Sequence, residues 1–344
     1  MKEITIALDA MGGDRGADIV VPAAIEMLKK YPNLNLILVG QQSVINKKLQ
    51  RRRAKSHDRI TVVHAEEIVG MDEPPATALR FKKDSSMRVA INLVKENIAQ
   101  ACVSAGNTGA LLATARFVLK TLPGIDRPAI IGMLPARNKE GYVRMLDLGA
   151  NIKATEEHLF QFAVMGSVLT KAIEGIKSPR VALLNIGEEE IKGHEEIKAA
   201  AVMLHANSEI NYIGYVEGND IFSDMADVIV CDGFAGNVAL KSIEGLANFI
   251  RSVIYKAVKK NIWTKLLALI AAPVFKIVRV DINPANYNGA SFVGLRGSVI
   301  KSHGGTTVSG FMRAIERAML EIEYNVPKLI SDEVAKLLKQ SEDA

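Results

Sequence analysis

Short apolar runs that end in glycine-bearing turns recur along the chain, and each is followed by a helix-like stretch. In a parallel α/β sheet such turns gather at the carboxyl edge of the strands, where glycine lets backbone N–H groups approach an anion. One such turn is explained by the need of α/β folds for glycine. Five such turns in one chain together predict a cleft that binds a phosphate-like anion. The run and turn pairs are Ile4–Leu8 with Asp9–Asp14, Ala101–Val103 with Ser104–Gly109, Arg144–Leu146 with Asp147–Asn151, Val181–Leu184 with Asn185–Glu188, and Val228–Cys231 with Asp232–Asn237.

Strand-like and helix-like runs alternate from residue 4 to about residue 245. Leu34–Val39 is a predicted strand that follows a helix ended by Tyr31–Asn33. Asp84–Arg88 begins another predicted helix, because Asp and Ser cap free N–H groups. This alternation predicts successive βαβ units with right-handed crossovers. We therefore expect an α/β protein in which residues 1–344 form a single unit or two lobes around a cleft.

The pattern changes in residues 250–280, which form a predicted amphipathic helical segment. Apolar pairs such as Ile262-Trp263 and Leu266-Leu267 are interrupted by lysines. The longest apolar run, Leu266–Phe275, is too short for a bilayer span, which takes roughly 20 residues. A core helix, a dimer interface and a membrane-surface helix remain open, and the basic flanks favour an exposed role. The predicted contact residues are Lys256, Lys259, Lys260, Trp263, Lys265, Leu266 and Leu267.

Composition fits a soluble enzyme with an aliphatic core. Of the 344 residues, 49% are hydrophobic but only 5% aromatic, as suits parallel strands covered by helices. Cys102 and Cys231 each end an apolar strand and cannot form a disulfide framework, so a reducing cytoplasm is expected. The chain enters its first strand almost at once, which argues against a signal peptide. The net charge of +5 favours an acidic partner, whereas the basic run Arg51–Lys55 lacks aromatics and argues against nucleic acid.

Several standard active-site motifs are missing from the sequence. There is no G-x-G-x-x-G after the first strand, no phosphate-binding G-x-x-x-x-G-K-[ST], no H-E-x-x-H and no G-x-S-x-G. The histidines are scattered, and no Cys/His group has metal-ligand spacing, so neither a cofactor nor a metal is expected. Only His303 lies in a turn of the kind that lines clefts.

Several longer stretches carry a common pattern: Ala7–Asp14, Lys82–Ala90, Ser104–Leu111, Leu146–Asn151, Asn185–Glu189, Cys231–Phe234, Gly236–Lys241, Gly294–Leu295 and His303–Gly304. In unbroken order over nearly the whole chain, they resemble the phosphate acyltransferases of bacterial phospholipid synthesis. The chain departs from that family at His194, where Asn is usual, which argues against a catalytic role for His194. It also departs at Tyr287–Ser291, where Tyr-Gly-Gly-Ala-Pro is usual.

The resemblance implies an activity and a fold. Members of this family transfer a fatty acyl group from acyl carrier protein to inorganic phosphate. The acyl phosphate then serves a downstream glycerol-3-phosphate acyltransferase in phosphatidic acid synthesis. The implied fold is a three-layer α/β/α Rossmann-like fold of the isocitrate dehydrogenase and phosphotransacetylase group, with a projecting helical segment. The implied state is a cytoplasmic homodimer that associates peripherally with the membrane, and residues 256–267 would contact the membrane or the carrier protein.

The implied reaction needs no catalytic triad. Phosphate near pH 7 is largely a dianion, because its second pKa resembles the value of about 6 for a phosphate monoester, and a thiol with a pKa near 8.5 is a tolerable leaving group. The protein must hold phosphate against the thioester and place donors at the developing oxyanion. Lys241 can supply positive charge to the phosphate, and an ordinary solvated helix lysine is an equal alternative for it. Arg296 or Lys301 can supply further positive charge.

The predicted site combines these glycine turns with nearby polar and cationic side chains. The predicted catalytic residues are Asn107, Thr108, Asn237, Lys241 and His303. The predicted substrate-binding residues are Gly12, Gly13, Asp14, Ser104, Gly106, Gly109, Asn151, Asp232, Gly233, Gly236 and Arg296. Three functions are compatible with such a cleft: a carrier-protein-dependent phosphate acyltransferase, a coenzyme A-dependent phosphotransacetylase, and a non-enzymatic anion-binding protein. The resemblance favours the first.

Overall fold

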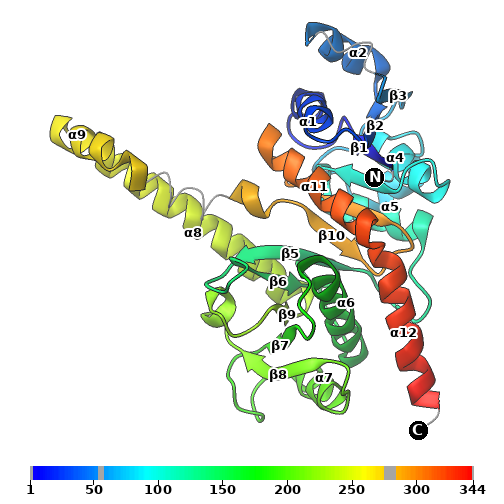
Figure 1. Cartoon of the computed structure of the whole chain (residues 1–344), viewed down its shortest axis with the longest axis vertical. Coiled ribbons are helices and arrows are strands. Elements are labelled where there is room, and N and C mark those ends of the chain that lie inside the picture. The colour runs from blue at the N-terminus through cyan, green and yellow to red at the C-terminus, as the bar shows by residue number, and fades with distance from the viewer. Residues whose placement is uncertain (1–2, 53–57, 275–283, 343–344) are drawn as a thin grey trace.

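One mixed sheet runs through the computed structural model of the chain, which describes residues 3–52, 58–274 and 284–342 (Figure 1). The order of its strands is β3-β2-β1-β4-β11-β10-β5-β6-β9-β7-β8. The strands are β1 Ile4–Asp9, β2 Leu34–Gly40, β3 Ile60–His64, β4 Ala101–Ser104, β5 Ala129–Pro135, β6 Tyr142–Leu146, β7 Arg180–Leu184, β8 Asn211–Val216, β9 Val228–Val230, β10 Ala290–Val293 and β11 Ser298–Lys301.

Helices cover both faces of the sheet and confirm the predicted three-layer α/β/α fold. On one face, α4 and α5 help to form a core that extends from β1 to β9. On the other face, α1, α2 and α11 pack over the first strands, and α6, α7 and α12 pack over β6, β7 and β9. The helices are α1 Ala17–Lys30, α2 Gln42–Arg51, α3 Pro75–Phe81, α4 Ser86–Lys95, α5 Thr108–Leu119, α6 Glu156–Glu174, α7 Glu195–His205, α8 Gly233–Lys259, α9 Ile262–Ile270, α11 Val308–Tyr324 and α12 Val326–Glu342.

The prediction that all the glycine turns gather at one sheet edge is wrong. β11 is parallel to β4, but β10 is antiparallel to both β11 and β5, and β5 is antiparallel to β6. Strand direction therefore reverses between β4 and β6. The turns after β1 and β4 leave one edge of the sheet, and the turns after β6, β7 and β9 leave the other. The antiparallel pair of β5 and β6 also interrupts the predicted series of βαβ units.

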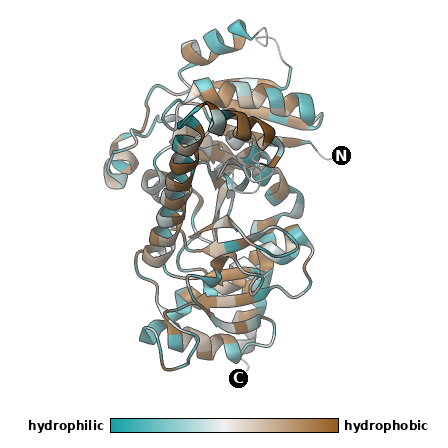
Figure 2. Ribbon diagram, turned by 90° about the vertical axis from the view of Figure 1, so that its left-hand side faces the viewer, coloured by the Kyte–Doolittle hydropathy of each residue, from teal (hydrophilic) through white to brown (hydrophobic). Residues whose placement is uncertain are grey.

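The structure agrees with the predictions made for single elements of secondary structure. β2 and the end of α1 lie where the sequence predicts them. Ser85 caps α4, because its side chain accepts a hydrogen bond from the backbone N–H of Arg88 at 3.3 Å. Cys102 and Cys231 are buried free thiols within the apolar core. The strands themselves are mainly hydrophobic, as Figure 2 shows. Positions 53–55 of the basic run lie outside the described residues.

α8 and α9 project from the body of the molecule (Figure 1). Only Gly233 and Gly236 of α8 are buried, and α9 has no buried residue. We call residues 246–270 the arm. Its side chains include Trp263, 73% exposed, and Leu267, 64% exposed. Within a single chain, residues 250–270 therefore do not form a core helix. Positions 275–280 of the predicted segment lie outside the described residues. No helix in the described part of the chain is long and apolar enough to cross a membrane.

Candidate active site

Asp9, at the end of β1, organises the loops that follow β1 and β4. Its carboxylate accepts hydrogen bonds from the hydroxyls of Ser86 and Ser104, each at 2.6 Å, and from the backbone N–H groups of Met11 and Gly12. Burial raises the pKa of Asp9, although these hydrogen bonds oppose the rise. The hydroxyl of Ser104 also accepts a hydrogen bond from the Gly106 N–H at 3.0 Å. Ser104 thus holds two loops in place rather than facing a substrate.

The loop after β11 packs against the same pair of loops. A Cβ on Gly13 would lie 2.9 Å from both the carbonyl O of Gly304 and the Cβ of Ala105, and Gly13 has a φ of +84°. The Asp14 N–H donates a hydrogen bond to the Gly304 carbonyl at 3.1 Å. A Cβ on Gly12 would lie 2.8 Å from the Gly106 backbone nitrogen. Glycine is therefore required where the three loops meet.

Asn107 caps α5, and its side-chain amide is fully engaged. Its Oδ1 accepts a hydrogen bond from the Ala110 N–H at 3.0 Å. Its Nδ2 donates to the carbonyl oxygens of Met71 at 2.6 Å and Glu73 at 3.1 Å. This arrangement fixes the 71–73 segment against the start of α5, so the structure favours a positioning role for Asn107. Thr108, the first residue of α5, is exposed, and Gly109 lies where a Cβ would meet Pro75.

Lys301, the last residue of β11, is a buried cation at this sheet edge. Its side chain is buried, and its Nζ donates to the carbonyl oxygens of Ser302 and, at 3.5 Å, of Ala105. Burial and the neighbouring charge of Lys241 lower the pKa of Lys301 to about 8, and Asp9 and Asp14 partly oppose this. A buried lysine whose pKa falls so far is typical of functional sites.

The first turn of α8 is packed against the loop that follows β6. Asp232 caps the helix by accepting a hydrogen bond from the Ala235 N–H at 2.7 Å. A Cβ on Gly236 would lie 1.9 Å from the Asp147 carbonyl O, and one on Gly233 would lie 2.7 Å from the Asn151 carbonyl O. These glycines therefore allow α8 to approach the loop, so they pack against protein backbone.

Asp147 holds the β6 loop in shape much as Asp9 holds the β1 loop. Its carboxylate accepts hydrogen bonds from four backbone N–H groups, including that of Asn151 at 2.7 Å. The Asn151 side-chain amide donates to the Asp147 carboxylate at 2.9 Å and to the Pro128 carbonyl at 2.8 Å. Asn151 is buried, and these contacts give it a structural role.

The next turns of α8 reach the loop after β11, although α8 begins at the opposite sheet edge. Lys241 pairs with Glu244 at 2.9 Å, and Glu244 lies 3.8 Å from His303 Nε2. Asn237 is exposed one turn before Lys241, beside Gly149. Glu244 thus bridges Lys241 and His303, and Lys301 is buried at the end of β11, two residues before His303. We call Lys241, Lys301 and His303 the lysine cluster.

Arg296 does not join this group. It lies two residues before β11 begins, whereas Lys301 ends that strand. Its Nε donates to the Thr121 carbonyl O at 3.0 Å, and its backbone N–H donates to the Lys120 carbonyl O. Of the two cations considered as alternatives in the sequence, the structure therefore places Lys301 at the site. Glu244 was not predicted; its spacing of three residues from Lys241 was the only available signal.

Phosphate-like charge is the ligand that this arrangement suits. Two lysines supply positive charge here, and the N-terminus of α5 and the ring of His303 supply hydrogen-bonding groups beside them. Neither cysteine is a suitable nucleophile, because burial raises the pKa of both the Cys102 and Cys231 thiols. No group of three or more metal-ligating side chains occurs within residues 3–52, 58–274 and 284–342. The site can stabilise charge on a bound reactant without a covalent protein intermediate.

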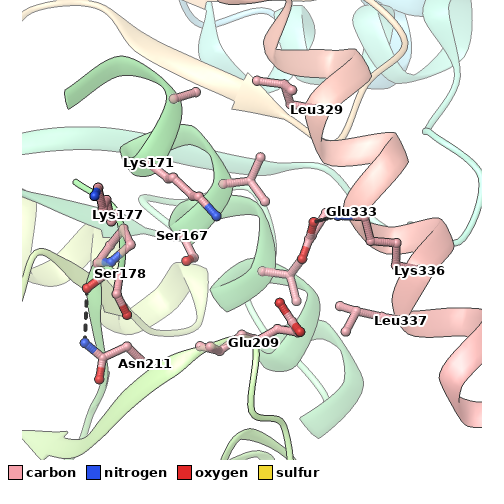
Figure 3. Close-up of a pocket in the computed structure, with 15 residues that line it drawn as sticks. Ser167, Lys171, Lys177, Ser178, Glu209, Asn211, Leu329, Glu333, Lys336 and Leu337 are labelled. Atoms are coloured by element: carbon pink, nitrogen blue, oxygen red, sulfur yellow. Dashed lines mark hydrogen bonds and ion pairs between the residues drawn. The ribbon is translucent and has the colours of Figure 1, made fainter. Parts of the chain in front are cut away.

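A separate pocket of about 280 Å³ lies between α6 and α12 (Figure 3). Lys171 on α6 and Glu333 on α12 face it from opposite sides, and the Asn211 side chain donates a hydrogen bond to the Ser178 carbonyl O at its border. None of the residues predicted for the site lines this pocket. It is therefore distinct from the lysine cluster.

Comparison with known proteins identifies the family. The family described as "Fatty acid synthesis protein" matches residues 4–329. A phosphate acyltransferase from Alkalilimnicola ehrlichii is 57% identical over 341 residues, which cover 99% of each chain. Another from Coxiella burnetii is 55% identical over 340 residues, which cover 98% of this chain and 99% of the relative. The chain belongs to the phosphate acyltransferase family. It is a transferase, and the resemblance found in the sequence is confirmed.

Solved structures with the same fold include phosphotransacetylases. A phosphotransacetylase from Streptococcus pyogenes aligns with a TM-score of 0.62 at 17% identity, over 93% of this chain and 94% of that one. A branched-chain phosphotransacylase from Enterococcus faecalis aligns with a TM-score of 0.57 at 14% identity, over 93% and 99% of the two chains. At such low identity the likeness concerns the fold alone, and it agrees with the predicted fold group.

Proposed function

We propose that this phosphate acyltransferase moves a fatty acyl group from acyl carrier protein to inorganic phosphate and releases an acyl phosphate. The observation that carries the proposal is the meeting of α8, β11 and the start of α5. Lys241 of α8 pairs with Glu244, which lies 3.8 Å from His303, and Lys301 of β11 donates a hydrogen bond to the Ala105 carbonyl O just before α5. Two cations next to a helix N-terminus suit a phosphate dianion. A downstream glycerol-3-phosphate acyltransferase would consume the product in phosphatidic acid synthesis.

The reaction proceeds by direct transfer in this proposal. A phosphate oxygen forms a bond to the thioester carbonyl carbon, and the carbonyl oxygen becomes negatively charged. Collapse of this intermediate breaks the C–S bond, and the carrier leaves as a thiolate that takes a proton from water. No general base is needed, because phosphate already carries the negative charge. The protein contributes orientation and electrostatic stabilisation.

Individual roles follow from burial and exposure. Lys301 is largely buried, so its charge acts with little screening on the phosphate or the oxyanion. Lys241 and His303 are exposed to solvent and bind the outer phosphate oxygens. In the free protein Glu244 pairs with Lys241, and phosphate replaces this carboxylate on binding. Asn237 and Thr108 face solvent nearby and donate hydrogen bonds to substrate.

The arm supports a further part of the proposal: a homodimer that associates peripherally with the membrane. Its exposed apolar side chains need a partner surface, and Lys256, Lys259, Lys260 and Lys265 can remain among anionic headgroups. The two uses can coexist if the α8 part pairs with a second copy and α9 enters the interface. The residues that we propose for the membrane contact are the ones predicted from the sequence, with Trp263, Leu266 and Leu267 at the centre.

A single assay tests the activity. Purified protein is incubated with phosphate and either long-chain acyl carrier protein or acyl-coenzyme A, and acyl phosphate is trapped with hydroxylamine. We expect phosphate-dependent product from the carrier-bound donor. Product from short-chain acyl-coenzyme A alone would instead identify a coenzyme A-dependent phosphotransacetylase, and no product from any donor would leave an anion-binding protein.

A further inference from the structure

Phe117, near the end of α5, holds two cations at the protein surface. Its side chain is 52% exposed. The Arg88 guanidinium carbon, from α4, lies 5.1 Å from the ring centroid, and the Lys120 Nζ lies 4.8 Å from it. Cations are attracted to the face of an aromatic ring, so the ring keeps two like charges close together. The structure thus concentrates positive charge around an exposed apolar side chain.

These cations have no acidic partner in the chain as far as it is described. Neither Arg88 nor Lys120 forms an ion pair among the described residues, whereas lysines on other helices do: Lys29 with Glu26, Lys198 with Glu195, and Lys336 with Glu333. α4 and α5 carry three cations and no Asp or Glu. A surface of this kind attracts an acidic partner and raises its rate of encounter.

Arg296 extends the same surface. Its backbone N–H donates a hydrogen bond to the Lys120 carbonyl O at 3.1 Å, and its Nε donates to the Thr121 carbonyl O at 3.0 Å. Both contacts hold the Arg296 backbone and side chain at the C-terminal end of α5. We define the α5 patch as Arg88, Arg116, Phe117, Lys120 and Arg296. Arg296 belongs to this patch rather than to the lysine cluster.

The α5 patch is connected to the candidate site by rigid elements. α4 and α5 lie side by side (Figure 1), and both begin at the site: Ser86 donates to Asp9, and Asn107 caps α5. Phe117 lies nine residues after Thr108, which is about 14 Å along a helix axis. A carrier protein that presents its acyl group on a tether docks at some distance from the reacting thioester, not on top of it. The separation therefore suits delivery of a tethered substrate.

We propose that the α5 patch is the docking surface for the acidic carrier protein that brings the acyl group. This inference rests on the proposed function, in which the donor is carrier-bound. The cations meet carboxylates of the partner, and Phe117 packs against an apolar side chain between them. Both interactions leave the arm free for a second copy or a membrane. The carrier protein is thereby assigned to a different surface from residues 256–267.

Charge reversal tests the patch. For the Arg88→Glu/Lys120→Glu variant we expect the KM for the acyl carrier protein to rise about tenfold or more, because rim charges govern encounter with a charged partner. We expect unchanged KM for phosphate and a weaker dependence of the carrier KM on salt. The matched control is Lys171→Glu/Lys177→Glu, which changes the charge equally at exposed lysines of the α6 pocket. It should keep the wild-type carrier KM.

A donor without the carrier protein separates the possible outcomes. Acyl-pantetheine has the thioester but no protein surface, so wild type and the charge-reversal variant should use it equally. Should wild type make no acyl phosphate from the carrier-bound donor, the proposed function fails. Should wild type use that donor and the variant keep the wild-type carrier KM, the docking inference alone is overturned. If the Glu variant unfolds, Arg88→Gln/Lys120→Gln gives the same test, because it removes the two positive charges without adding negative ones.

Discussion

The first turn of α8 and its distal half differ in how closely the rest of the chain surrounds them. At Gly236, an added Cβ would lie 1.9 Å from the Asp147 carbonyl O. At Gly245 in the same helix, an added Cβ would meet nothing within 4 Å, and Phe249 one turn on is 65% exposed. One helix therefore joins a tightly packed site to a surface that the chain itself leaves uncovered.

The two parts of α8 therefore serve different purposes: the first turn stabilises the fold, and the exposed half is available to bind partners. The packed turn sets the direction of α8, and that direction carries Lys241 and Glu244 across the sheet to His303 in the loop after β11. The exposed half contributes little to the stability of a single chain, because its apolar side chains are not removed from water. Substitutions in the first turn should therefore act on stability, and substitutions in the arm should act on association.

The largest expected effect comes from a matched pair of glycine substitutions. Gly236→Ala should lower the free energy of unfolding by roughly 3 kcal/mol, because a methyl group has no room against the Asp147 backbone. Gly245→Ala should raise it by up to about 1 kcal/mol, because alanine favours an exposed helix. Urea unfolding followed by circular dichroism measures both. Equal stabilities in the two variants would refute the contrast between the two halves.

Lys301→Met should lower turnover by about 100-fold, as expected for loss of a donor to developing negative charge. The pKa of Lys301 is lowered to about 8, so the wild-type lysine is charged below that pH and loses its proton above it. Phosphate KM in wild type should therefore rise as pH increases through about 8. Phosphate itself does not explain such a trend, because it is already a dianion there.

The pH profile of the variant is the control for this lysine. Met carries no charge at any pH, so the phosphate KM of Lys301→Met should be high and almost constant over the same range. Steady-state kinetics at several pH values provide the measurement. A variant whose profile follows that of wild type would show that another group titrates.

In the arm, Leu266→Glu/Leu267→Glu should weaken binding to anionic vesicles, because burying each leucine contributes about 2 kcal/mol. Folding and activity in solution should persist. Ile191→Glu/Val202→Glu is the control, since both side chains are exposed elsewhere. Vesicle sedimentation and the molar mass in solution distinguish the alternatives. Loss of the dimer or aggregation would make these leucines an interface between copies, and undiminished vesicle binding would place the membrane contact elsewhere.

Local signals in the sequence predict elements well in this protein. Apolar runs locate β1, β4, β6, β7 and β9, because a buried strand needs a continuous apolar stretch. Ser85 caps α4 as predicted, since capping depends on residues within one turn. The exposed character of the arm was favoured by its basic flanks. In each case the determining interactions are close in sequence.

Long-range placement could not be predicted in the same way. β10 and β11 come from the C-terminal part of the chain and insert between β4 and β5, and nothing in their own residues specifies those neighbours. Asn107 was predicted to face an anion, but its amide donates to Met71 and Glu73, which belong to a different loop. Burial of Lys301 likewise depends on elements distant in sequence. The reversal of strand direction explains why only part of the predicted site gathers.

The most direct test of the central claim is the phosphate dependence of turnover in Lys241→Ala. If Lys241 and Lys301 together bind phosphate, the KM for phosphate should rise about fivefold, a modest factor because Lys241 is exposed to solvent. The KM for the acyl carrier protein should stay at its wild-type value, since Lys241 lies outside the α5 patch. A phosphate KM identical to that of wild type would contradict the account and return Lys241 to an ordinary solvated helix lysine.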